Sequence, residues 1–154
     1  MSKKKGFRRR GRESAFGFLY AMSFADIDDG PGLKRSFDLC PKGEEDQVPQ
    51  EVADFAWELV QGVFGKRDEL DKLINDYSQN WKLSRIARVE LAILRLSLFE
   101  MIYSPDIPLK VAINEAVELS KRYGDENSRS FVNGILDAVA RAVMEGKFGI
   151  HKEF

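Results

Sequence analysis

The residues best suited to bind a ligand are arginines close to the N-terminus. Residues 1–12 contain seven Lys and Arg and no Asp or Glu, and the arginines among them are Arg8, Arg9, Arg10 and Arg12. A guanidinium group can hold a phosphate through two hydrogen bonds, and the free N–H groups at a helix N-terminus also attract phosphate. Arg8 and Arg12 are four residues apart and would share one face of a helix. The block is interpreted as a nucleic-acid-binding arm, with a solvated or disordered tail as the alternative.

The rest of the chain is acidic. The 154 residues include 24 basic and 25 acidic side chains, which leaves 17 basic against 25 acidic beyond residue 12. Residues 25–50 concentrate acidic side chains together with Pro31, Pro41 and Pro49, a composition typical of loops. We expect a surface excursion there, with at most a short helix around residues 33–39.

The sequence lacks the motifs of catalytic and metal sites. Cys40 is the only cysteine and His151 the only histidine, which excludes an intramolecular disulfide and a zinc site built from Cys and His. A single histidine close to the C-terminus also makes a catalytic triad improbable. Residues 62–66 look briefly like a phosphate-binding loop, but Val60 stands where the first glycine is needed and Arg67 where a Ser or Thr would hold magnesium. We therefore expect no enzyme, no cofactor and no metal.

No segment reads as a secretory signal or a membrane span. The arginines occupy the place where a signal peptide needs an apolar run. The most hydrophobic stretch, residues 86–103, carries charges that would be costly at a bilayer centre: Arg88, Glu90, Arg95 and Glu100. It is predicted to be a core helix in which Arg95 and Glu100 form internal salt bridges. The expected localisation is cytoplasmic.

Apolar residues recur with helical spacing through most of the chain, and no segment alternates as a strand does. Helices are predicted to start near residues 12, 49, 70, 86, 108 and 127, with ends at Gly65 and Gly124. Asn127 or Ser128 is expected to cap the last helix, and Gly134 within it to let another helix approach closely. The predicted fold is all-α, a single domain of about six to seven helices over residues 1–154.

Four segments of the sequence resemble the NusB family of transcription antitermination factors. They are RRRGRESA at residues 8–15, VELAILRL at 89–96, DIPLKVAINEAVEL at 106–119 and SFVNGILD at 130–137. These matches leave residues 25–50 as an elaboration of this protein. The resemblance implies an all-helical bundle made of two sub-bundles, with residues 1–12 as a basic arm and residues 84–146 as a C-terminal signature region.

The resemblance also implies a function. Members of the family are non-enzymatic bacterial RNA-binding factors. Together with NusE, a ribosomal protein, they recognise single-stranded boxA RNA, notably in ribosomal RNA operons, as part of the antitermination complex of RNA polymerase. By resemblance, the RNA-binding residues are Arg8, Arg9, Arg10, Arg12, Tyr77, Asn127 and Phe131. Tyr20 and Glu90 match positions on the surface that faces NusE.

Each transferred role has a structural alternative. Phe131 is as readily a core residue as a base-stacking one, and Asn127 is more readily a helix cap than a base reader. Tyr20 could be a core residue with its hydroxyl at the edge, and Glu90 a solvated carboxylate.

Two glycines and the arginines give further expectations. Gly11 and Gly17 weaken the first helix, so that the arginine segment is expected to become ordered only on RNA. If Arg8, Arg9, Arg10 and Arg12 each displace a counterion from single-stranded RNA, log K should fall with log salt at a slope of about −2.8.

Two other functions compete with sequence-selective RNA binding. One is an RNA-modifying enzyme, because NusB-like helical domains also occur attached to RNA methyltransferases, although this sequence has no glycine-rich cofactor loop. The other is a helical protein-interaction module, for example a homodimer, without sequence-selective RNA binding.

Overall fold

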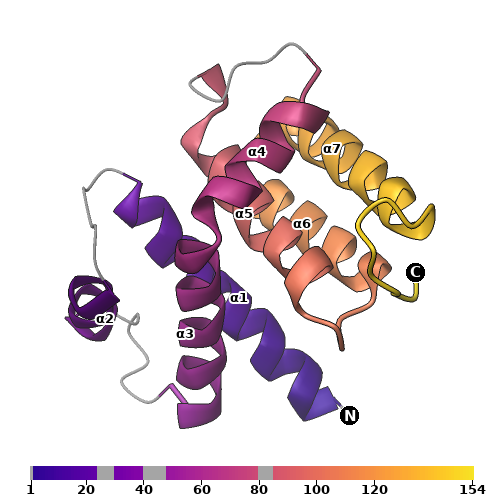
Figure 1. The fold of residues 1–154 in the computed structure, drawn as a ribbon. Coiled ribbons are helices and arrows are strands. Elements are labelled where there is room, and N and C mark those ends of the chain that lie inside the picture. The colour runs from indigo at the N-terminus through magenta and orange to yellow at the C-terminus, as the bar shows by residue number, and fades with distance from the viewer. Residues whose placement is uncertain (1, 24–29, 40–47, 80–84) are drawn as a thin grey trace. The chain divides into compact units, whose positions relative to one another are not determined.

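The computed structural model describes residues 2–23, 30–39, 48–79 and 85–154. Within these ranges the chain forms α-helices and no β-strand, which confirms the all-α prediction (Figure 1). The helices are α1 (Ser2–Met22), α2 (Gly30–Leu39), α3 (Gln50–Gly65), α4 (Arg67–Tyr77), α5 (Arg88–Tyr103), α6 (Leu109–Tyr123) and α7 (Glu126–Met144). They divide into two compact units, Met1–Gly65 and Lys66–Phe154. The break predicted at Gly65 is therefore both a helix end and a unit boundary.

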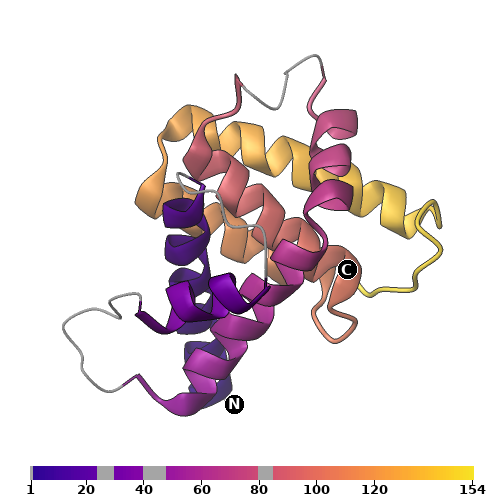
Figure 2. The ribbon, with the colours of Figure 1, turned by 60° about the vertical axis from the view of Figure 1, so that its left-hand side comes forward.

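The first unit is built on the packing of α1 against α3 (Figures 1 and 2). Apolar residues of the two helices recur at helical spacing and are almost wholly buried: Ala15, Phe16 and Phe18 from α1, and Val52, Ala56, Leu59, Val60 and Val63 from α3. Burial of such side chains is worth about 1.5–3 kcal/mol each. This packing fixes the direction of the helix that carries the arginines.

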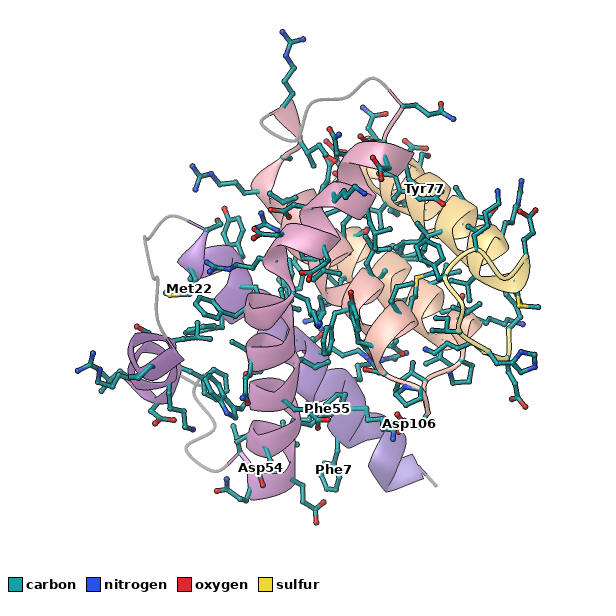
Figure 3. The ribbon with its side chains drawn as sticks, in the orientation of Figure 1. Phe7, Met22, Asp54, Phe55, Tyr77 and Asp106 are labelled. Atoms are coloured by element: carbon teal, nitrogen blue, oxygen red, sulfur yellow. The ribbon has the colours of Figure 1, made fainter. Side chains whose placement is uncertain are left out.

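Gly11 has a packing role at the contact between α1 and α3. A Cβ atom at Gly11 would lie 2.6 Å from Cδ1 of Phe55, closer than two carbon atoms can approach. The absence of a side chain thus lets the Phe55 ring of α3 lie directly against α1 (Figure 3). Although glycine has a low helix propensity, α1 runs from Ser2 to Met22 and includes Gly11. The reason is tertiary packing, which outweighs a helix propensity of about 1 kcal/mol.

The acidic excursion contains more structure than expected. Instead of a short helix around residues 33–39, α2 runs over ten residues from Gly30. Its buried Leu33 and Phe37 attach it to the unit, and the Phe37 ring lies 5.4 Å from that of Phe18 and 5.3 Å from that of Trp57. Residues 25–29 and 40–47 of the excursion lie outside the described residues, as do the loops expected there.

The second unit is built around α5. Helices α4, α6 and α7 all pack against α5, as its nearly continuous apolar surface predicts (Figure 1). Arg95 of α5 forms the internal salt bridge expected for it, because its Nε and Nη2 donate to the two carboxylate oxygens of Asp71 on α4 at 2.7 and 3.0 Å. This bidentate pair fixes α4 beside α5.

The turn between α6 and α7 differs in detail from its prediction. Gly124 ends α6, as expected, but in an extended conformation with φ −110°. Glycine is required there because a Cβ would lie 2.8 Å from the Cβ of Ser128. The cap of α7 is neither Asn127 nor Ser128 but Asp125, whose carboxylate accepts the N–H of Ser128 at 2.8 Å. The prediction of the cap was therefore wrong by two or three residues.

The C-terminal segment returns to the start of α6. The carbonyl oxygens of Glu153 and Phe154 accept the N–H groups of Leu109 and Lys110, each at 3.0 Å. Lys152 donates from Nζ to the carbonyl oxygens of Glu100 and Ile107. Its partial burial lowers the pKa of the Lys152 ammonium group. These bonds join the last residues to α5, to the loop that follows it and to the start of α6.

No helix in the described part of the chain is both long and apolar enough to cross a membrane.

Candidate nucleic-acid interface

The arginines of α1 differ in how accessible they are. Arg9 and Arg10 are exposed and Arg8 is half-buried, whereas Arg12 is only 4% exposed. The guanidinium carbon of Arg12 lies 5.7 Å from the centre of the Phe55 ring, a cation–π contact within the unit Met1–Gly65. Arg8 and Arg12 thus share the less exposed face of α1. Arg12 is therefore less accessible than the other three arginines of the predicted nucleic-acid-binding arm.

A hollow of about 250 Å³ lies between the C-terminal end of α4 and the middle of α7. We call it the α4–α7 hollow; its lining includes Tyr77, Gln79, Ser130, Phe131, Gly134 and Ala138. Tyr77 and Phe131 are far apart in the sequence and are brought together because α4 lies against α7 (Figure 3 labels Tyr77). Both rings are half-buried, so that neither is a fully buried core residue.

Gly134 contributes to this hollow through its lack of a side chain. A Cβ atom at Gly134 would meet no other atom within 4 Å, and the residue is exposed. The expectation that Gly134 permits close approach of another helix is therefore wrong. The helix face that it occupies opens onto the hollow instead of a neighbouring helix.

Asn127 lies in the first turn of α7 and its side chain is exposed. Because Asp125 provides the cap, the structure gives Asn127 no capping role. The hydrogen bonds that Asp125 accepts from the backbone and side chain of Ser128 lower the pKa of its carboxyl group. Asn127 does not line the α4–α7 hollow, but it precedes Ser130, the first lining residue on α7, by about one helical turn.

The two residues assigned to a partner surface lie in different units. Tyr20 of α1 is 36% exposed, and its ring stacks on the buried Phe16 with centres 6.3 Å apart. Tyr20 is thus exposed to solvent on one side and packs against a core side chain, Phe16, on the other. Glu90 lies in the first turn of α5 and is half-buried. Burial, followed by the charge of Asp125, raises the pKa of the Glu90 carboxyl group.

Sequence analysis missed three polar or small residues of the α4–α7 hollow: Gln79, Ser130 and Gly134 as a lining residue. Gln79 has a left-handed backbone with φ 45°, which follows the end of α4. No spacing rule connects positions 79, 130 and 134, because their proximity depends on how α4 packs against α7. Ser130 and Gly134 are one helical turn apart, and this spacing is the only sequence signal that places these two residues on the same face of α7.

Comparisons with known proteins agree on one family. A model described as "NusB family" matches residues 9–141. The transcription antitermination protein NusB of Desulfovibrio desulfuricans is 47% identical over 152 residues, with 96% of this chain and 93% of the relative covered. The NusB of Myxococcus xanthus is 46% identical over 138 residues, which cover 90% of this chain and 97% of the relative.

Solved structures give the same result. NusB of T. maritima superposes with a TM-score of 0.76 at 34% identity, covering 93% of this chain and 97% of that one. A crystal structure of the antitermination factors NusB and NusE in complex with dsRNA superposes with a TM-score of 0.74 at 26% identity, covering 88% of this chain and 97% of that one.

Proposed function

The chain belongs to the NusB family, and from this premise we propose that it is a bacterial transcription antitermination factor. In this proposal it binds boxA-type RNA, notably of ribosomal RNA operons, together with NusE, and acts within the antitermination complex of RNA polymerase. Support for the partners comes from the related complex of NusB, NusE and dsRNA. The protein acts by binding and not by catalysis.

The α4–α7 hollow carries the proposal. Two half-buried aromatic rings, Tyr77 and Phe131, flank a recess whose rim offers the amide of Gln79 and the hydroxyl of Ser130. Unpaired bases are recognised by stacking on aromatic rings and by hydrogen bonds to their edges. The recess therefore suits an unpaired base, and its polar groups supply selectivity.

Arginines of α1 supply the affinity for phosphate. Arg9 and Arg10 are exposed on α1, and Arg8 is half-exposed beside them. Phosphate contacts of this type position RNA without reading its sequence. Arg12 contacts the Phe55 ring and is nearly buried, so its assignment to RNA binding depends on the family resemblance of residues 8–15 alone.

Asn127 adds a polar group on the first turn of α7, where its exposed amide can read a base or hold a phosphate. Tyr20 in the first unit and Glu90 in the second are each assigned to contacts with NusE. An exposed tyrosine on a buried ring is a rigid anchor of the kind that dominates protein interfaces.

Binding of boxA-like and scrambled RNA, with and without NusE, tests the proposal. We expect the wild-type protein to bind boxA-like RNA more tightly, and NusE to increase that preference. The double variant Arg9→Ala/Arg10→Ala should bind both RNAs more weakly, since it removes contacts that ignore sequence.

Two outcomes would contradict the proposal. Equal affinity for both RNAs in every condition would remove sequence selectivity. A stable homodimer whose size and stability ignore both RNA and NusE would favour a helical interaction module instead.

A further inference from the structure

Tyr77 also lines a second hollow. It has a volume of about 340 Å³, and we call it the Tyr103 hollow. Its lining includes Glu69, Lys72 and Tyr77 of α4, Tyr103 at the end of α5, and Lys147 and Phe148 after α7. All of these residues belong to the unit Lys66–Phe154. The volume is within the range of small-molecule pockets, about 300–1,000 Å³.

Three aromatic rings of the Tyr103 hollow are half-buried, which leaves part of each ring accessible. The Tyr77 and Phe148 rings lie 6.5 Å apart with an angle of 35° between their planes. Tyr103 leans on Phe99 at 5.7 Å, and Nζ of Lys66 lies 5.0 Å from the centre of the Tyr103 ring. The rings are thus held in place by neighbours and form a stacking platform.

Lysines surround these rings. Lys72 is exposed and forms no ion pair with any residue that the structure describes. Lys147 is exposed and is held by Glu145, with Nζ and Oε2 3.1 Å apart. Ammonium groups at the rim of an aromatic hollow suit a ligand that combines a flat ring with a phosphate. The carboxylates of Glu69 and Asp76 also reach the hollow, so that charge alone does not account for binding and the rings must contribute.

Tyr77 lines both hollows, so the two hollows are neighbours. A strand of RNA with one base in the α4–α7 hollow would therefore have a second stacking surface next to it for a neighbouring nucleotide. We propose that the Tyr103 hollow binds an unpaired nucleotide of the RNA that flanks the element held in the α4–α7 hollow. This inference rests on the proposed function and extends its RNA surface to Lys72, Tyr103, Lys147 and Phe148.

The test compares a boxA-like RNA with the same RNA extended at its 5′ or 3′ end by about five uridines, a length within the range of single-strand binding sites. One of the two extensions should bind the wild-type protein about tenfold more tightly than the short RNA, which corresponds to about 1.4 kcal/mol. Lys72→Glu should abolish that gain and leave the affinity for the short RNA unchanged. Tyr103→Leu, which removes the ring but keeps an apolar side chain, should do the same.

Lys110→Glu is the matched control, because Lys110 is an exposed lysine of the same unit outside both hollows. It should retain the full gain from the extension. A 5-iodouridine in the extension should cross-link on irradiation to the peptide that contains Tyr103 or Phe148, as identified by mass spectrometry.

The two proposals fail in different ways. If the wild-type protein does not distinguish the short RNA from a scrambled one, the proposed function fails. If it does, but neither extension tightens binding, the Tyr103 hollow is not an RNA site and the inference is overturned. A Lys72→Glu variant that binds both RNAs normally but loses NusE would assign the hollow to a protein partner and would also overturn it.

Discussion

Gly11 and Gly17 of α1 are the same residue type on the same helix but have different surroundings. A Cβ at Gly11 would collide with Phe55, whereas a Cβ at Gly17 would meet nothing within 4 Å. Gly11→Ala should therefore destabilise the protein by about 1–3 kcal/mol, the usual cost of overpacking. Gly17→Ala should be neutral or stabilise it by up to about 1 kcal/mol, since alanine favours a helix.

Urea unfolding followed by circular dichroism would measure both variants. Equal stability of the two would show that the Phe55 ring moves aside without cost and that Gly11 has no packing role.

Gly134 offers a test of the α4–α7 hollow that leaves the fold intact. Because a Cβ there meets no other atom, Gly134→Ala should keep RNA affinity and stabilise α7 by about 1 kcal/mol. Gly134→Glu places a negative charge beside Tyr77 and Phe131 and should lower RNA affinity at least tenfold while the melting temperature stays within a few degrees of wild type. Filter binding and thermal melting on the same samples would separate the two effects. Unchanged affinity of Gly134→Glu would place the RNA elsewhere.

At the start of α7, Asp125 caps the helix, whereas Asn127 is proposed to bind RNA. Asp125→Ala should lower the melting temperature, because it leaves the N–H of Ser128 without its acceptor. The pKa of Asp125 is lowered in the fold, so its contribution is present above the pKa of the unfolded chain and is lost as the pH falls through the folded-state pKa. The stability difference between wild type and Asp125→Ala should thus shrink in acid. Asn127→Ala should keep the melting temperature and weaken RNA binding.

Melting curves between neutral and acidic pH would measure these differences. A pH-independent difference, or a loss of stability in Asn127→Ala equal to that in Asp125→Ala, would contradict the assignment of the cap.

Glu90 in the first turn of α5 gives a second test at this scale. Its pKa is raised by burial and by Asp125, so the folded state disfavours the ionised form. The resulting penalty is absent below the unfolded-state pKa and complete above the folded-state pKa. Glu90→Gln should therefore be as stable as wild type or more stable at neutral pH, with no difference in strong acid. If Glu90 faces NusE, the same variant should bind NusE more weakly, as measured by calorimetry.

Most helix spans were predictable, because they depend on apolar spacing within one segment. The breaks at Gly65 and Gly124 and the internal pairing of Arg95 follow from local sequence in the same way. The cap at Asp125 was not predictable, because Asp125, Asn127 and Ser128 could each cap the helix and only the backbone of the turn selects one. The open face at Gly134 and the contact at Gly11 depend on which helix lies opposite, which no local pattern contains.

The candidate site was predictable only in part for the same reason. Resemblance supplied Tyr77 and Phe131, which the structure brings to one hollow. It did not supply Gln79 or Ser130, whose roles arise from packing between α4 and α7. The burial of Arg12 also depends on packing, since its sequence neighbours at positions 8–10 carry the same charge and are more exposed.

For the whole molecule, the main quantity is the salt dependence of RNA binding. Beyond residue 12 the chain is acidic, with 17 basic against 25 acidic residues, so attraction to RNA must come from local groups. With Arg12 buried, contacts by Arg8, Arg9 and Arg10 predict a slope of log K against log salt of about −2.1, in place of about −2.8 for four. Arg9→Ala/Arg10→Ala should reduce that slope by about 1.4.

Titration of binding over a range of potassium chloride concentrations would measure the slope. A slope that is zero, or that the double variant leaves unchanged, would remove α1 from the RNA interface. The variant Lys110→Glu serves as the control for a change in net charge alone.

Oxygen atoms of the C-terminal residues accept hydrogen bonds from the first N–H groups of α6. The first N–H groups of a helix usually point into water and exchange their hydrogens quickly, but those of Leu109 and Lys110 donate to Glu153 and Phe154. Deuterium uptake at these two amides therefore reports whether residues 153 and 154 are bound to the start of α6, without any label being attached to the protein. A ligand or partner that displaces the tail would reveal itself as faster exchange at the beginning of α6.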